Sequence, residues 1–70
     1  MLVVKPEELR AWRMELGLTQ DQVAKRAKMT QHRVADAESR LLGKVTTYIK
    51  LNEALASFAA ERLTPQAIAA

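Results

Sequence analysis

The chain has 70 residues, no cysteine and a single histidine, and 49% of its residues are hydrophobic. This length allows one small domain, and the lack of cysteine excludes disulfides and thiolate metal sites. No apolar run approaches membrane-spanning length, and the first residues are too short and uncharged for a signal peptide. We therefore expect a soluble, cytoplasmic, nucleoid-associated protein that needs no cofactor and no metal.

The net charge of +3 is unevenly distributed along the chain. Positive and negative side chains balance in residues 1–17 and again in residues 45–70, so the whole excess falls in residues 18–44. A local basic excess favours an anionic partner. The composition is dominated by Ala, Leu, Glu, Lys, Arg and Gln, which predicts an all-α fold, a compact bundle of about five short helices.

The first helix is predicted in "KPEELRAWRMEL". Its early proline and two glutamates suit a first helical turn, and Leu9, Trp12 and Leu16 form one apolar stripe. Gly17 then predicts a left-handed end to this helix.

Two threonines predict the starts of the next two helices. Thr19 precedes "QDQVAKRA", in which Gln22 completes a capping-box pattern. Thr30 precedes "QHRVADAESRL" in the same way. The side chains of this third helix that we expect to face inward are Val34, Ala37 and Leu41. Only Lys28 and Met29 separate the second helix from the cap of the third, so the two helices must turn sharply against each other.

Two further helices are predicted in the second half of the chain. Thr47 is the expected cap of a fourth helix, whose recurring positions are Tyr48, Leu51, Leu55, Phe58 and Arg62. Thr64 and Pro65 predict a restart as a fifth helix. We expect one domain over residues 1–70, with a helix-turn-helix unit at about 19–41 and C-terminal helices at 47–70 that complete the core and dimerise.

The stretch "LGLTQDQVAKRAKMTQHRVADAE" resembles the helix-turn-helix of the phage repressor and Cro family, also called the XRE family. The matching positions are Gly17, Leu18, Thr19, Gln20, Val23, Ala24, Ala27, Thr30, Val34 and Glu38. The resemblance implies a lambda-repressor-like fold and sequence-specific DNA binding. The chain departs from the pattern at Lys28, at the small Ala37 and at Arg40. Lys28 replaces a turn glycine, so either this residue adopts a positive φ or the turn differs slightly from that of the family.

In this family the third helix enters the major groove of double-stranded DNA. The resemblance implies base contacts from Gln31, His32, Arg33, Ala35 and Asp36. It implies contacts with the DNA backbone from Gln20, Lys28, Thr30, Lys44, Thr46 and Thr47. It also implies a structural salt bridge between Arg13 and Glu38, the alternative being two unrelated surface charges.

Some roles remain open between two interpretations. Asp36 either accepts from a cytosine amine or orients and neutralises His32 and Arg40, which lie four residues away on either side. Arg33 reaches either guanine or a phosphate. Lys25 and Arg26 either contact DNA or form a solvated face.

The sequence thus favours a transcriptional regulator, a repressor that binds an inverted repeat as a homodimer, and not an enzyme. The alternative is an antitoxin, which binds a toxin or another partner protein and autoregulates its operon. The alanine-rich tail "EALASFAAERLTPQAIAA" could form the interface of a homodimer or the interface with a toxin. Dimers would form through the C-terminal helices, or through the N-terminal "MLVV" pairing as a strand across the two-fold axis.

Overall fold

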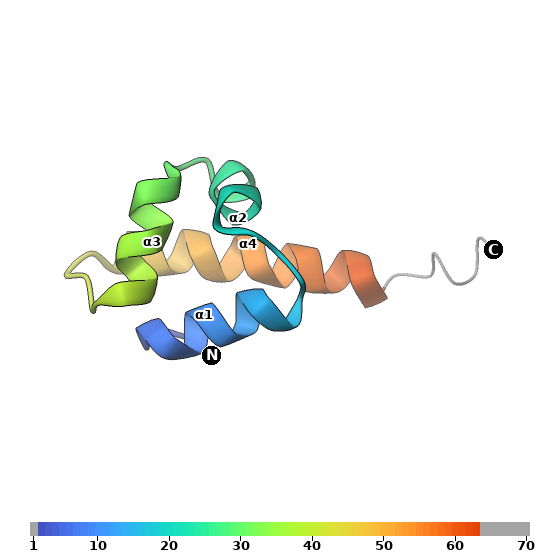
Figure 1. Ribbon diagram of the computed structural model, residues 1–70, viewed down its shortest axis with the longest axis horizontal. Helices are drawn as coiled ribbons and strands as arrows, with labels where there is room; N and C mark the ends of the chain where they lie inside the picture. The colour runs from blue at the N-terminus through green and yellow to red at the C-terminus, as the bar shows by residue number, and fades with distance from the viewer. Residues whose placement is uncertain (1, 64–70) are drawn as a thin grey trace.

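The computed structural model describes residues 2–63, and this part of the chain is all-α, with four helices and no strand. The helices are α1 (Pro6–Glu15), α2 (Gln20–Ala27), α3 (Gln31–Ser39) and α4 (Val45–Leu63). The longest of them, α4, extends along the molecule, and α3 lies near its start (Figure 1). The expected fifth helix falls on residues 64–70, outside the described residues. None of the four helices is both long and apolar enough to cross a membrane.

Side-chain caps start α2 and α3 where the sequence predicts them. The Thr19 hydroxyl accepts from the Gln22 backbone N–H at 3.1 Å, and the Gln22 side chain accepts from the Thr19 N–H at 2.7 Å. The Thr30 hydroxyl accepts from the Arg33 N–H at 3.2 Å. These bonds satisfy backbone donors that the first helical turns leave unpaired, so both predicted caps are confirmed.

Left-handed residues end α1 and α2. Gly17 follows α1 with a φ of 69°, and Lys28 ends α2 with a φ of 58°. The prediction for Gly17 is confirmed, and of the two alternatives for Lys28 the structure contains the positive φ. Lys28 is the only non-glycine residue with a positive φ among the described residues, which means that the turn before α3 is formed under backbone strain.

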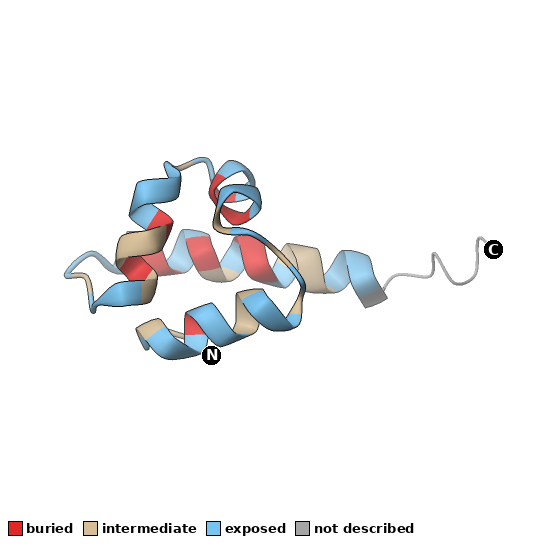
Figure 2. Cartoon of the chain, in the orientation of Figure 1, coloured by how far each residue is buried: buried red, intermediate tan, exposed pale blue. Residues whose placement is uncertain are grey.

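The hydrophobic core lies between α4 and the other three helices (Figure 2). Its buried side chains are Leu9, Val23, Ala24, Ala27, Val34, Ala37, Tyr48, Leu51, Ala54 and Leu55. Four of these ten are alanines, and small side chains allow helix backbones to approach closely. Ala37, the position at which the sequence departs from the family pattern, is completely buried.

The structure corrects the predictions for the segment between α3 and α4. The third helix ends at Ser39 and Leu41 is 69% exposed, so its inward placement was wrong. The backbone is extended at Arg40, and this carries Leu42 toward the core, where its N–H donates to the Tyr48 hydroxyl. The fourth helix begins at Val45, so Thr47 lies inside its first turn and is not its cap.

The N-terminal arm, residues 2–5, forms no helix or strand, and the Asn52 side chain attaches it to α4. Asn52 accepts from the Val3 N–H at 2.8 Å and donates to the Val3 carbonyl at 2.8 Å. Both backbone groups of Val3 are therefore used within the chain. Strand pairing across a dimer axis through the Val3 N–H would have to break its bond with Asn52, which argues against the "MLVV" hypothesis.

We predict that Lys28→Gly raises the free energy of unfolding by about 0.5–1 kcal/mol. Glycine removes left-handed strain of about 1–2 kcal/mol but loses more backbone entropy on folding. Urea unfolding measures the change. Lys25→Gly, inside α2, is the control and should lower stability by about 1 kcal/mol. A Lys28→Gly protein no more stable than the parent would contradict the strained turn.

Candidate nucleic-acid interface

A buried ion pair joins α1 to α3. Arg13 Nε lies 2.7 Å from Glu38 Oε2, and Arg13 Nη2 donates to Glu38 Oε1 at 3.0 Å. The two side chains are 12% and 6% exposed, so the predicted salt bridge is confirmed and the alternative of unrelated surface charges is wrong. Arg13 Nη1 also donates to the Leu18 carbonyl at 2.7 Å. The pair therefore fixes α1, α3 and the segment before α2 to one another.

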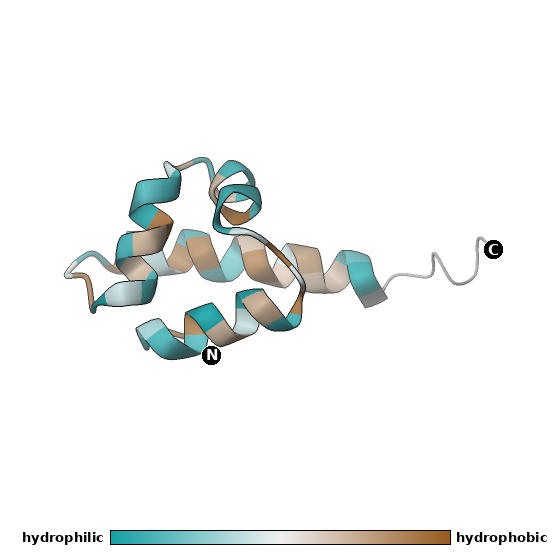
Figure 3. Cartoon of the chain, viewed as in Figure 1, coloured by the Kyte–Doolittle hydropathy of each residue, from teal (hydrophilic) through white to brown (hydrophobic). Residues whose placement is uncertain are grey.

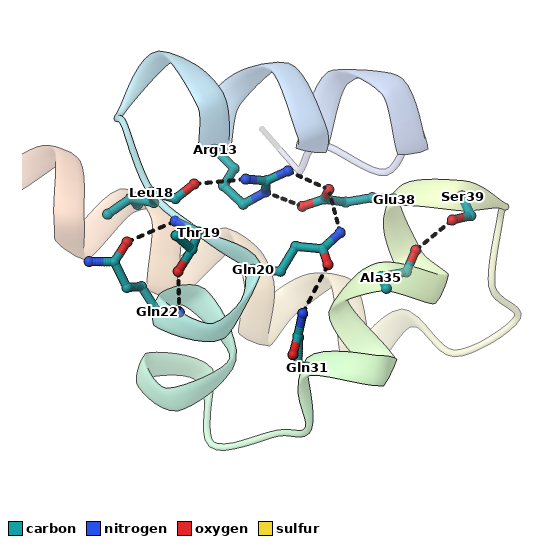
Figure 4. A network of polar contacts seen from close by, with 9 residues as sticks. All are labelled: Arg13, Leu18, Thr19, Gln20, Gln22, Gln31, Ala35, Glu38 and Ser39. Carbon is teal, nitrogen blue, oxygen red and sulfur yellow. Dashed lines mark hydrogen bonds and ion pairs between the residues drawn. The ribbon is translucent and has the colours of Figure 1, made fainter.

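Two glutamines extend this ion pair to the start of α3 (Figure 4). Gln20 Nε2 donates to Glu38 Oε1 at 3.2 Å, and Gln31 Nε2 donates to Gln20 Oε1 at 3.4 Å. A carboxylate paired with arginine only accepts, so the Gln20 amide nitrogen must face Glu38 and its oxygen must face Gln31. The exposed Gln31 is left with its carbonyl oxygen and one N–H for an external partner.

The acidic residue on α3 is paired with its helical neighbours. His32 Nε2 lies 3.5 Å from Asp36 Oδ2, and Arg40 Nη2 lies 3.8 Å from the same oxygen. These contacts agree with the interpretation in which Asp36 orients and neutralises its neighbours. Ala35, the other expected base contact in this part of α3, is only partly exposed.

An open hollow with basic walls lies between α3 and the start of α4. The residues that line this basic hollow are Lys28, Met29, Thr30, Arg33, Lys44, Thr46, Thr47 and Lys50. It brings together five of the six side chains predicted to contact the DNA backbone; Gln20 instead lies in the amide chain described above. Thr47 is 4% exposed and presents little surface there.

Two cations of the hollow were not among the predicted contacts with the DNA backbone: Arg33, which was predicted to contact a base, and Lys50. Arg33 lines it beside Lys44, which favours the phosphate interpretation of Arg33 over the guanine one. Lys50 was missed because its charge was counted as balanced within residues 45–70. Its spacing was the available signal: Lys50 follows Thr46 by four residues and Thr47 by three, and helical residues at these intervals share a face.

The partners of the cations distinguish this hollow from the rest of the surface. Six of the eleven Lys and Arg side chains have an ion-pair or hydrogen-bond partner: Lys5, Arg13, Lys25, Arg26, Arg40 and Arg62. The other five have none among the described residues: Arg10, Lys28, Arg33, Lys44 and Lys50. Four of these five line the basic hollow. Unpaired positive charge is therefore concentrated in one place, where it can attract an anion.

Lys25 and Arg26, for which DNA contact and a solvated face were both open, each have a partner within the chain. Lys25 Nζ lies 3.2 Å from Asp21, and both side chains are exposed. Arg26 pairs with Glu61 at 2.7 Å and lies 3.8 Å above the centre of the Phe58 ring. These contacts engage Arg26 in holding α2 against α4, which favours a structural role.

Comparisons with protein-family models, curated proteins and solved structures found no match to this chain. Within residues 2–63, no group of three or more His, Asp or Glu side chains lies close enough to hold a metal ion. The case for a function therefore depends on the geometry and charges described above.

We predict that Glu38→Ala lowers the free energy of unfolding by about 3–5 kcal/mol, because it leaves Arg13 buried without its partner. The double variant Arg13→Met/Glu38→Leu should recover much of this loss, since no buried charge remains. Equilibrium unfolding in urea measures both. A loss below about 1 kcal/mol for Glu38→Ala would place the pair among weak surface salt bridges.

Proposed function

We propose that the chain is a sequence-specific DNA-binding transcriptional regulator, a repressor that acts as a homodimer on an inverted-repeat operator. The capped helices α2 and α3 are joined by three residues, 28–30, as in helix-turn-helix units. This arrangement supports the resemblance to the phage repressor and Cro family. The observation that carries the proposal is the concentration of unpaired cations beside the start of α3.

The basic hollow suits the DNA backbone. Duplex DNA carries one negative charge per roughly 1.7 Å of helix axis, and neutralising its phosphates releases bound counterions. Lys28, Lys44 and Lys50 offer charge without the cost of breaking an existing ion pair within the described residues. Thr30 caps α3, whose N-terminal N–H groups also favour phosphate oxygens.

The first turn of α3 suits base edges in the major groove. Adenine presents an N6 amine that donates and an N7 that accepts, and the outward oxygen and N–H of Gln31 match both. The His32 side chain is 87% exposed beside it and offers a second polar contact. Phosphate contacts at the hollow would set the register, and these two side chains would specify the sequence.

An antitoxin that binds a toxin protein is the second candidate. It is favoured by the exposed apolar side chains of Leu41 and Val45, which a partner protein would cover. This candidate does not conflict with DNA binding, because an autoregulating antitoxin uses one surface for the partner and another for its operator. Co-purification in a defined complex with a second protein would favour it.

We predict that Lys50→Ala weakens binding to all duplexes by a similar factor. It should reduce the slope of log affinity against log salt concentration by about 1, because one phosphate contact is lost. Arg10→Ala is the matched control, since Arg10 is unpaired among the described residues but lies outside the basic hollow. Titration of labelled DNA at several salt concentrations measures both slopes. Equal slopes in the two variants would contradict the proposed role of the hollow.

We predict that Gln20→Ala lowers the preference for the operator over random DNA, with a cost of about 1–3 kcal/mol in discrimination if the Gln31–base contact is lost. The reason is that Gln31 would lose the acceptor that orients its amide. Asp21→Asn, at an exposed position of the same helix, is the control and should retain the preference. Selection of bound duplexes from a random pool supplies the operator for this measurement. An undiminished preference in Gln20→Ala would show that Gln31 needs no orientation by Gln20.

A further inference from the structure

The basic hollow contains a hydroxyl group that has no hydrogen-bond partner within the described residues. It belongs to Thr47, which is 4% exposed, and buried polar groups normally have a partner. No fully enclosed polar side-chain atom in residues 2–63 lacks a partner, so the Thr47 hydroxyl must still reach an opening. Thr47 lines the basic hollow and a second hollow that shares four of its lining residues. The unpaired hydroxyl therefore faces into these adjoining hollows.

Two helices begin at the same hollow. Thr30 is the cap of α3, and Thr46 and Thr47 belong to the first turn of α4. The first backbone N–H groups of a helix have no partner inside that helix, and they carry partial positive charge. The ribbon of α3 is accordingly hydrophilic in its first turn (Figure 3). The backbone therefore adds to the positive potential of the hollow from two directions.

The lining of the basic hollow contains cations and no acid. All four of its cations are exposed and have no ion-pair partner among the described residues: Lys28, Arg33, Lys44 and Lys50. The adjoining hollow contains one carboxylate, Asp36, which is already paired with His32 and Arg40. The positive charge around Thr47 is therefore available to an anionic ligand.

The burial of Thr47 distinguishes two kinds of phosphate. A phosphate within duplex DNA is a diester, with a sugar attached on each side. A terminal phosphate has three unesterified oxygens and is attached on one side only, so it can enter a narrow opening end-on. The DNA backbone can contact the exposed cations of the hollow, whereas the hydroxyl of a residue that is 4% exposed is better suited to a terminal phosphate.

We propose that the basic hollow binds the terminal phosphates of a free oligophosphate, and that this ligand competes with DNA. Thr47 donates to a terminal oxygen, and the four cations and the two helix starts balance the negative charge. A phosphate monoester carries a charge of about −1.5 to −2, so two or three linked phosphates match four cations better than one phosphate does. The hollow encloses about 350 Å³, within the range of roughly 300–1,000 Å³ for small-molecule sites.

The competition with DNA rests on the proposed function, whereas the binding of the oligophosphate does not. Lys44 and Lys50 are proposed to contact the DNA backbone, and a bound oligophosphate would neutralise both. A ligand that binds only the DNA-free protein lowers its apparent affinity for DNA in proportion to ligand occupancy. DNA binding by this short chain would then respond to the concentration of a small anion.

Isothermal titration calorimetry without DNA tests the site, with tripolyphosphate as the probe and sulfate at the same ionic strength as the reference. The parent should bind tripolyphosphate at least about tenfold more tightly than sulfate. Thr47→Val should weaken this binding about tenfold, because a hydrogen bond to a charged oxygen is lost. Ser39→Ala is the control and should retain the affinity, since it removes an exposed hydroxyl outside the hollow.

Thermal unfolding verifies that Thr47→Val leaves the fold intact, as expected for a hydroxyl with no partner in the described part of the chain. Equal binding of tripolyphosphate and sulfate, or equal affinity of Thr47→Val and the parent for tripolyphosphate, would overturn the site. Adenosine triphosphate distinguishes two sources of terminal phosphates. Tighter binding than that of tripolyphosphate identifies a nucleotide as the ligand, and equal or weaker binding identifies an inorganic oligophosphate; both results support the site.

Displacement of a labelled duplex at constant ionic strength tests the competition. Tripolyphosphate should release half of the bound duplex at a concentration at least about tenfold lower than sulfate does. Equal concentrations would overturn the competition. A protein that binds tripolyphosphate but no duplex would contradict the proposed function and support the site. A protein that binds duplex but prefers sulfate to tripolyphosphate would overturn the site alone.

Discussion

The buried pair of Arg13 and Glu38 is the constraint on which the geometry of the proposed DNA-binding face depends. It fixes the first helix to the third, and the contact of Arg13 with Leu18 adds the segment before α2. Because Glu38 only accepts, it also sets the direction of every hydrogen bond from Gln20 to Gln31. A buried salt bridge adds little net stability compared with apolar packing. Here the pair holds Gln31, the side chain proposed to contact a base, in one orientation through Gln20.

Apart from Arg10, the cations of the described residues fall into two groups, those paired within the chain and the unpaired ones around the basic hollow. Several exposed cations on or next to α1, α2 and α3 are paired: Lys5 with Glu8, Lys25 with Asp21, and Arg40 with Asp36. The cations around the basic hollow have no partner in the described part of the chain. Pairing reduces the field of a cation outside the protein, so the surface potential is expected to be strongest at the hollow. A net charge of only +3 is therefore compatible with a local attraction for a polyanion.

Local sequence rules predicted the features that depend on neighbouring residues. The caps at Thr19 and Thr30 and the left-handed end at Gly17 follow from positions at most three residues apart, whereas the positive φ of Lys28 was an expectation from the family pattern. The Arg13–Glu38 pair spans 25 residues, and it was predicted only through the family resemblance. No rule that relates neighbouring residues connects two side chains so far apart in the chain.

The failures of prediction have a common physical cause. Leu41 continued the helical spacing, but the chain leaves the helix at Arg40 so that Leu42 can reach the core. Lys50 belongs to the basic hollow because α4 packs with that side toward α3. Helical spacing places Lys50 on the face of Thr46 and Thr47, but it does not specify which way that face turns. Segment ends and the orientation of helices are decided by packing between distant parts of the chain. Patterns among neighbouring residues therefore do not predict them.

The most direct measurement of the central claim is the mapping of backbone amide chemical shifts during titration with duplex DNA. The account predicts that the largest changes occur at Gln20, at residues 30–33, at residues 44–47 and at Lys50. Amides around Arg10 and Met14 on α1 should change little. Changes centred on α1, or an absence of any change with a selected duplex at low salt, would contradict the assignment of the third helix and the basic hollow to DNA.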